Sequence, residues 1–279
     1  MTKLFFIAFA CPALLLGCNI KQLYSDLQLP PFPGYAVATF DQQHCAEPSG
    51  IVFSARQGTL FVVGDEGDIC ELLPDGTLLR KAHINKVDLE GITIDPATGI
   101  LYAIDEHTGT VLEIHPDNLQ VLRRMPVSNI SIRHPPASKR NNRGFEAITF
   151  VPDPDHRSGG SFFLANQGWS AEDSAAVSEA VELHNTPDTE KPLKIIRSFE
   201  PGMTDLSGLH HDNASELILI ISDEHNALLL LTTDGVLRAG YTLPGKNQEG
   251  ITLDASGHLY IAEDSGDIIK YTFPAMLGH

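Results

Sequence analysis

Five short phrases of one form recur along this chain, and they constrain its fold more than any other feature. Each phrase places a glutamate or a serine before a small residue and then a short apolar run. The phrases are DLEGITID, GFEAITF, QEGITLD, PSGIVF and LSGLHHD. Their anchor residues lie about 40 to 60 positions apart, a period typical of four-stranded propeller blades. The anchors are Ser49, Glu90, Glu146, Ser207 and Glu249.

Each anchor begins a series of strand-like segments separated by turn signals. The second segment of each series is apolar, and PDG or TDG turns precede several of the fourth segments, where glycine supplies a positive φ. The last series has only three segments before the chain ends. We therefore expect a strand at 35–40 to pair with the strand that contains Tyr271 and to close the ring. The sequence predicts an all-β fold, a single five-bladed β-propeller over 34–279.

The predicted geometry brings acidic residues to one mouth of the central channel. The first strand of each blade lines the channel, and its start lies beside the end of the antiparallel second strand. Carboxylates gathered there repel one another and lose hydration, so they need protons, water or a cation. Oxygen ligands suit Ca²⁺ or Mg²⁺ better than Zn²⁺. The candidate metal ligands are Glu90, Glu146 and Glu249, with Asp65, Asp105 and Asp223 as further members. Alternatively, the glutamates accept hydrogen bonds from backbone amides of neighbouring blades and only brace the channel.

Two long insertions are expected on the same face. One spans Ser128–Gly144 and carries several cations, and the other follows Asn166 and contains the single tryptophan. Long loops on a rigid scaffold often bind ligands, although they can also be merely solvated. The residues expected to contact a ligand are Ser49, Ser207, Glu224, Arg143 and Trp169.

The N-terminus indicates export. One lysine precedes an apolar run that is too short for an ordinary membrane span, and the run ends in Leu-Leu-Gly-Cys, which resembles the lipobox of bacterial lipoproteins. This resemblance implies that 1–18 is a signal peptide, that Cys18 is lipidated, and that 19–33 is a tether. A plain cleaved signal peptide and an uncleaved anchor are the alternatives. Because Asn19 follows the cysteine in place of aspartate, we expect an anchor in the outer membrane, facing the periplasm.

Two further features concern the compartment and the partners. Cys45 and Cys70 are expected at one edge of one blade, where they form either a disulfide or two buried thiols. The formal net charge of −17 argues against nucleic acid as a partner, because binding to phosphates requires a basic face.

The anchor phrases, together with ISDEHNALLLLTTDG and the C-terminal run to KYTF, resemble the SdiA-regulated family of bacterial envelope proteins. The resemblance extends from about Tyr35 onward. It implies a five-bladed propeller behind a signal peptide or membrane anchor, with a calcium site in the propeller. It implies no firm activity. The resemblance implies that Glu90, Glu146 and Glu249 bind the calcium ion, with Asp65, Asp105 and Asp223 as secondary candidates.

These features favour a non-enzymatic function. We expect a lipid-anchored envelope propeller that binds calcium at the channel mouth and presents a site for a small molecule or a protein. GxSxG, HExxH and P-loop patterns are absent, and His210 and His211 are expected to be structural. The alternative is a metal-dependent hydrolase, lactonase-like or phosphoesterase-like, that uses the same ion with Glu249 as the general base. A scaffold that needs no ion is a third possibility.

Overall fold

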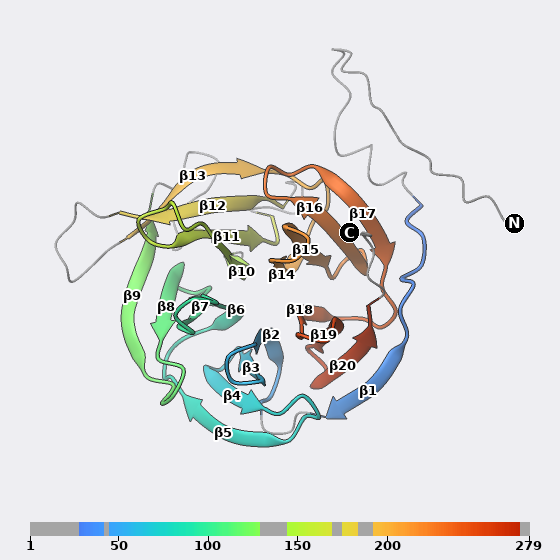
Figure 1. Cartoon of the computed structure of the whole chain (residues 1–279), viewed down its shortest axis with the longest axis horizontal. Helices are drawn as coiled ribbons and strands as arrows, with labels where there is room; N and C mark the ends of the chain where they lie inside the picture. The colour runs from blue at the N-terminus through green and yellow to red at the C-terminus, as the bar shows by residue number, and fades with distance from the viewer. Residues whose placement is uncertain (1–27, 42–44, 129–143, 169–174, 184–191, 274–279) are drawn as a thin grey trace, which may run out of the picture.

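The computed structural model describes residues 28–41, 45–128, 144–168, 175–183 and 192–273. These residues form twenty strands and no helix, so the described part of the chain offers no helical segment able to cross a membrane. The strands are arranged around a central axis in the manner of a β-propeller (Figure 1). The prediction of an all-β propeller is therefore confirmed.

Two sheets are complete antiparallel meanders of four consecutive strands. The first has the order β2-β3-β4-β5, and the second has the order β14-β15-β16-β17. Their strands are β2 (Pro48–Ser54), β3 (Thr59–Gly64), β4 (Asp68–Leu72), β5 (Leu78–His83), β14 (Leu206–Asp212), β15 (Leu217–Ser222), β16 (Ala227–Thr232) and β17 (Leu237–Thr242).

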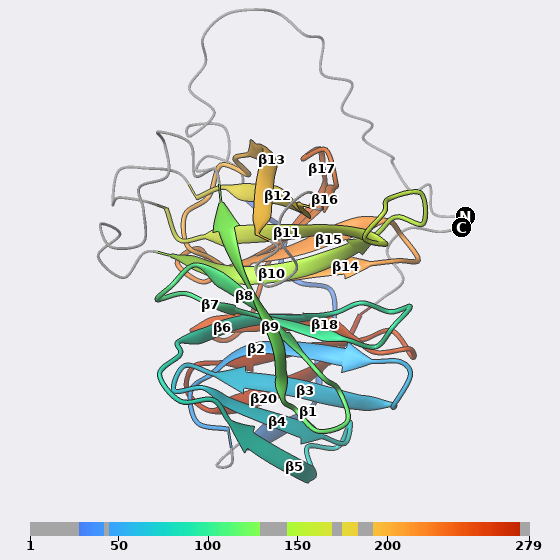
Figure 2. The same ribbon diagram turned by 90° about the vertical axis from the view of Figure 1, so that its left-hand side faces the viewer.

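A third sheet has eight strands in the order β10-β11-β12-β13-β9-β8-β7-β6. It consists of two antiparallel meanders that meet at their outer edges, where β13 and β9 pair in parallel through Leu193–Val127 and Lys194–Ser128 (Figure 2). The strands are β6 (Leu89–Ile94), β7 (Leu101–Asp105), β8 (Thr110–Ile114), β9 (Val121–Ser128), β10 (Phe145–Pro152), β11 (Gly160–Asn166), β12 (Val177–Glu182) and β13 (Leu193–Phe199).

The fourth sheet joins the two ends of the described chain. Its order is β1-β20-β19-β18, and β1 (Ala36–Asp41) runs antiparallel to β20 (Asp267–Thr272), with Ala36 opposite Tyr271. The remaining strands are β18 (Gln248–Leu253) and β19 (His258–Glu263). The predicted pairing of an N-terminal strand with the Tyr271 strand is present, so β20 is not left with an exposed edge.

Burial along the strands explains the sequence pattern. The second strands β3 and β15 are buried at every position, and they are almost wholly apolar because sheets pack against both of their faces. The outer strand β5 alternates between half-buried and exposed residues, as expected for a strand with one solvated face. The five inner strands β2, β6, β10, β14 and β18 contact one another in this order, and β18 contacts β2, so they close around the axis.

Part of the segment predicted as a tether packs on the propeller. Pro31 bridges to Thr242, and Phe32 is buried with its ring edge-on to Tyr241 and Tyr271 and stacked on Phe273. The packed part of the chain therefore begins before Gly34. The predicted signal peptide, including Cys18, lies outside the described residues.

The two cysteines expected near each other are adjacent. Cys45 and Cys70 are buried in one apolar cluster with Leu60 and Tyr260, and Cys45 also lies 3.6 Å from the carbonyl of Val62. The contact with Cys70, together with burial, raises the pKa of the Cys45 thiol.

Candidate metal centre

Each of the five anchor residues occupies a β-bulge in an inner strand. In β2, for example, Pro48 pairs with Gly64 and Gly50 with Val63, so Ser49 is the extra residue between them. A bulge releases one residue from the ladder and redirects its side chain. The register is interrupted at the corresponding point of every inner strand, at Ser49, Glu90, Glu146, Ser207 and Glu249.

Small residues follow the anchors because the inner strands approach one another closely there. A Cβ atom on Gly50 would lie 2.4 Å from the carbonyl oxygen of Glu90, and one on Gly91 would lie 2.6 Å from the amide nitrogen of Ile148. The cavity on the axis at this level has a volume of only about 10 Å³, about the minimum that one water molecule requires. The channel thus has a narrow waist, with the anchors at one side of it.

The two serine anchors brace neighbouring inner strands. The Ser49 hydroxyl lies 3.0 Å from the carbonyl oxygen of Leu89 in β6 and also contacts Asp65. The Ser207 hydroxyl donates a 2.5 Å hydrogen bond to the carbonyl of Gln248 in β18. These serines therefore have the bracing role that was one of the two expectations for the glutamates.

The glutamate anchors behave differently. Within the described residues, Glu90, Glu146 and Glu249 accept no hydrogen bond from a backbone amide, and Oε1 of Glu146 is buried without a partner. Burial, and then the charge of Asp65, raises the pKa of Glu90 to about 9. Burial, and then Asp223, raises the pKa of Glu249 to about 8. Carboxyl groups in this condition bind either protons or a cation.

Three carboxylates at this mouth converge closely enough to share one ion. Asp88, Glu90 and Glu106 each offer a ligand oxygen, and these oxygens all lie within 4.8 Å of one another. The amide of Gly144 fixes Glu106 through a 2.6 Å hydrogen bond to Oε1. Burial, and then Glu106, raises the pKa of Asp88 to about 6.

Glu146 lies beside this cluster. Its carboxyl group contacts that of Glu106, and its pKa is raised well above the ordinary value by burial and then by the charges of Glu90 and Glu106. Together with the three convergent carboxylates, it gives the mouth an oxygen-rich donor set.

Comparison with known proteins identifies the family of this chain. The family model described as SdiA-regulated matches residues 34–265. The chain belongs to the SdiA-regulated family. The resemblance drawn from the anchor phrases is thereby confirmed.

Solved structures with low sequence identity share the fold of this SdiA-regulated protein. The crystal structure of glutaminyl cyclase from Myxococcus xanthus is 14% identical, with a TM-score of 0.61, and the match covers 85% of this chain and 95% of that chain. The β-propeller domain of Cps50 (Swd1) from Myceliophteria thermophila is 9% identical, with a TM-score of 0.50, and the match covers 86% and 99% of the two chains. At these identities the likenesses show a common propeller architecture only.

The structure places the other expected ligands of this SdiA-regulated protein outside the convergent cluster. Asp105 is fully buried and accepts hydrogen bonds from the Thr108 hydroxyl at 2.6 Å and the Asp88 amide at 3.3 Å. Asp223 accepts one of 2.9 Å from the amide of Gln248. Asp65 contacts Ser49. Asp105 and Asp223 thus stabilise turns and strand junctions, whereas Asp65 also lies close enough to Glu90 for its charge to raise the pKa of that carboxyl group.

The residues expected to contact a ligand differ in their burial within the described structure. Ser49 and Ser207 are buried braces, and Glu224 is exposed and contacts Thr204. Arg143 and Trp169 lie outside the described residues.

Two members of the cluster were missed by sequence reasoning. Asp88 precedes Glu90 by two positions, and Glu106 is the second acid of an Asp-Glu pair of which only Asp105 was selected. The alternation of side chains along a strand was an available signal, because residues two apart in DLEG face the same side.

Proposed function

We propose that this protein is a five-bladed propeller of the cell envelope that binds Ca²⁺ at the acidic mouth of its channel. The observation that carries the proposal is the convergence of Asp88, Glu90 and Glu106 within 4.8 Å. Two oxygens that are each about 2.4 Å from one Ca²⁺ ion can be at most about 4.8 Å apart, so this spacing is compatible with a shared ion. The closed circle of five inner strands supports the number of blades.

The chemistry of the donor set fits a hard cation. The described members of the cluster are all carboxylates, and Ca²⁺ takes six to eight oxygen ligands, whereas Zn²⁺ prefers imidazole and thiolate. Glu146, with one buried oxygen unpartnered, would complete the set from the neighbouring inner strand. Bound Ca²⁺ would supply positive charge that relieves the repulsion among these carboxylates. Asp88 and Glu90 are half-buried, so the ion would also be able to face a small molecule or a protein at the mouth.

A titration with calcium tests this function. The full chain, purified in mild detergent, is titrated by calorimetry and melted with and without Ca²⁺, beside Glu90→Gln, Glu146→Gln and the exposed control Glu200→Gln. We expect saturable binding and a higher melting temperature for the wild type and the control. At one hundred times Kd the stabilisation is about 2.7 kcal/mol. Unchanged binding in both cluster variants would overturn the site.

The envelope location is supported by the lipobox-like end of the N-terminal apolar run. We infer that Cys18 carries the lipid and that the protein faces the periplasm from the outer membrane. The test is metabolic labelling with a fatty-acid analogue, followed by membrane fractionation, for the wild type and Cys18→Ser. Loss of label and of membrane association in the variant is expected. Label that persists in Cys18→Ser would contradict the anchor.

A further inference from the structure

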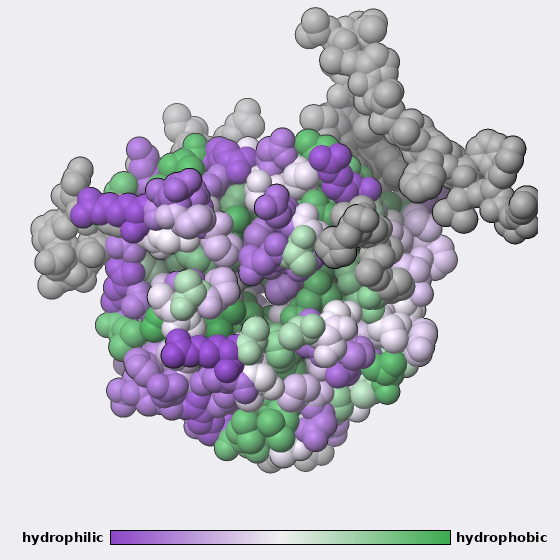
Figure 3. Space-filling view, viewed as in Figure 1, coloured by the Kyte–Doolittle hydropathy of each residue, from purple (hydrophilic) through white to green (hydrophobic). Residues whose placement is uncertain are grey.

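The channel has a second mouth, beyond the waist, with a cavity of about 290 Å³. The C-terminal ends of the five inner strands and the turns that follow them bound this cavity. Figure 3 views the molecule from this side, and apolar residues lie among polar ones near the axis. The volume is near the lower end of the range for small-molecule sites. Because the waist has room for about one water molecule, the cavity is separate from the carboxylate cluster.

Most polar groups of the inner strands at this level are already engaged. The hydroxyls of Thr93, Thr149 and Thr252 each accept a hydrogen bond from a backbone amide of the next inner strand. The donors are Phe150 at 3.0 Å, His211 at 2.8 Å and Phe53 at 3.0 Å, respectively. These threonines therefore brace the ring.

Strand β14 has a histidine, His210, where three other inner strands have threonine. Its Nδ1 lies 3.4 Å from the Thr252 hydroxyl. This hydroxyl also accepts from the Phe53 amide. In the tautomer in which Nδ1 accepts the hydroxyl proton, Nε2 of His210 carries the ring proton. Burial lowers the pKa of His210 to about 4, so the neutral imidazole presents one N–H donor.

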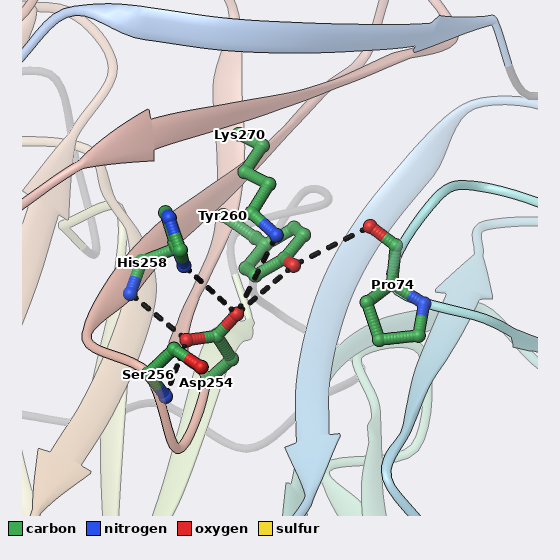
Figure 4. A network of polar contacts seen from close by, with 6 residues as sticks. All are labelled: Pro74, Asp254, Ser256, His258, Tyr260 and Lys270. Atoms are coloured by element: carbon green, nitrogen blue, oxygen red, sulfur yellow. Dashed lines mark hydrogen bonds and ion pairs between the residues drawn. The ribbon is translucent and has the colours of Figure 1, made fainter.

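The acidic residues around the cavity already accept hydrogen bonds from residues of the turns that contain them. Asp212 accepts hydrogen bonds from the Ser215 hydroxyl at 2.6 Å and the Ala214 amide at 3.1 Å. Asp254 accepts from the amides of Ser256 at 2.8 Å and His258 at 2.9 Å (Figure 4).

Asp254 has a further set of partners on its other oxygen. The hydroxyl of Tyr260 lies 3.1 Å from Oδ2, and the ammonium of Lys270 lies 3.6 Å from it (Figure 4). With these contacts, neither carboxylate needs a partner from a ligand.

Among the residues that the structure describes, Arg56 is a cation that lines the cavity and has no carboxylate as a counter-ion. Arg56 is exposed at the rim, and its Nη1 donates a 3.0 Å hydrogen bond to the carbonyl of Thr98. Among the described residues, no carboxylate forms an ion pair with it. Its remaining N–H groups are suited to a carboxylate, which a guanidinium binds in a bidentate manner.

We propose that the second mouth binds a small organic acid with an aromatic or apolar body. The carboxylate of such a ligand contacts Arg56, and a second acceptor takes the Nε2–H of His210. The body packs among Phe53, Phe150 and Leu253, which line the cavity. This site does not depend on the calcium site.

The probes are benzoate, phenylacetate and 3-phenylpropionate, each beside its neutral amide, titrated into the full chain in detergent by calorimetry and ligand-observed NMR. A ligand of this size is expected to bind with a Kd on the order of 1 mM. We expect at least one acid to bind about tenfold more tightly than its amide, and Arg56→Gln to remove this preference. The control Arg124→Gln, on the outer strand β9, leaves it unchanged.

A second variant tests the histidine. His210→Phe keeps a planar ring but has no N–H donor. We expect this variant to bind the acid about threefold to tenfold more weakly than the wild type does. Equal affinities for acid and amide, an unaffected Arg56→Gln variant, or no binding at about 10 mM would overturn the proposal. Saturation with Ca²⁺ leaves the affinity unchanged, so a failed cation site does not affect this result.

Discussion

The hydroxyl of Ser207 in β14 donates a 2.5 Å hydrogen bond to the backbone carbonyl of Gln248 in β18. Both residues are buried, so the contact joins two inner strands away from water. The Ser49 hydroxyl in β2 likewise lies 3.0 Å from the carbonyl oxygen of Leu89 in β6, and it also contacts Asp65. Serine anchors thus hold the ring together, whereas glutamate anchors place carboxyl groups at its mouth.

Replacing Ser207 by alanine tests the bracing role. The carbonyl of Gln248 would lose its partner in a buried position, which costs about 1 to 3 kcal/mol of unfolding free energy. Urea unfolding measures this cost, and Ser256→Ala at an exposed turn serves as the control, with an expected change within about 0.5 kcal/mol. Calcium affinity should be unaffected. An unchanged midpoint for Ser207→Ala would show that the hydroxyl does not stabilise the ring.

The stability of the calcium-free protein should decrease as the pH rises from about 6.5 to about 9. In the folded state the pKa of Glu249 is about 8 and that of Glu90 about 9, against an ordinary value of 4.5. The folded state therefore holds more protons than the unfolded state in this range, and the stability from these groups is lost as the pH passes through their folded pKa values. The lowered pKa of His210 has the opposite effect, but only between about 4 and 6.5.

Urea midpoints in a chelator and in saturating Ca²⁺ measure this dependence. Calcium binds the ionised carboxylates, so its stabilising effect should grow with pH across the same range. The double variant Glu90→Gln, Glu249→Gln should show a flatter curve in the chelator. A wild-type midpoint that is constant from about pH 6.5 to 9 would contradict the raised pKa values.

Local patterns were sufficient to predict most of the architecture. Segments such as TLFVVG are continuously apolar because β3 is buried on both faces, and this pattern is visible without any tertiary information. The shortage of one strand after Tyr271 likewise predicted the pairing of β1 with β20. Phe32 was not predicted to be packed, because a short proline-rich segment gives no periodic signal.

The candidate site depended on contacts that no local pattern specifies. The Asp105-Glu106 pair could direct either acid toward the axis, and the register of β6 against β7 decides that Asp105 binds the turn while Glu106 joins the cluster. The bulges at the anchors are also a matter of pairing between strands. Sequence reasoning therefore chose Asp105 as a candidate ligand, whereas the carboxylates that converge in the structure are those of Asp88, Glu90 and Glu106.

Asp88 belongs to the convergent cluster, and Asp223 belongs to the set of ligands expected from the sequence. Substitutions at these two residues compare the two sets directly. Asp88→Asn should weaken calcium binding by about tenfold or more, because it removes an anionic ligand of the cluster. Asp223→Asn should leave the calcium Kd within about threefold but lower the unfolding free energy by about 1 kcal/mol, because the Gln248 amide loses a charged acceptor. Calorimetry and urea unfolding measure the two effects. The reverse outcome would favour the set expected from sequence.

The waist of the channel makes Gly91 a sensitive position. A Cβ atom there would lie 2.6 Å from the amide nitrogen of Ile148 and 2.9 Å from Cα of Ala147, so Gly91→Ala forces β6 and β10 apart. Such overpacking costs about 1 to 3 kcal/mol. Because Glu90 precedes Gly91 directly, the displacement should weaken calcium binding as well as stability.

Ala147→Gly is the matched control for this prediction. Ala147 follows Glu146 as Gly91 follows Glu90, and removal of its methyl group creates no clash. We expect a cost of about 1 to 2 kcal/mol from the flexibility of glycine and from the loss of a buried methyl group, with little change in calcium affinity. Urea midpoints and calcium titrations are measured for both variants. An equal loss of calcium affinity in the two variants would mean that the close approach of β6 and β10 does not hold Glu90 in place.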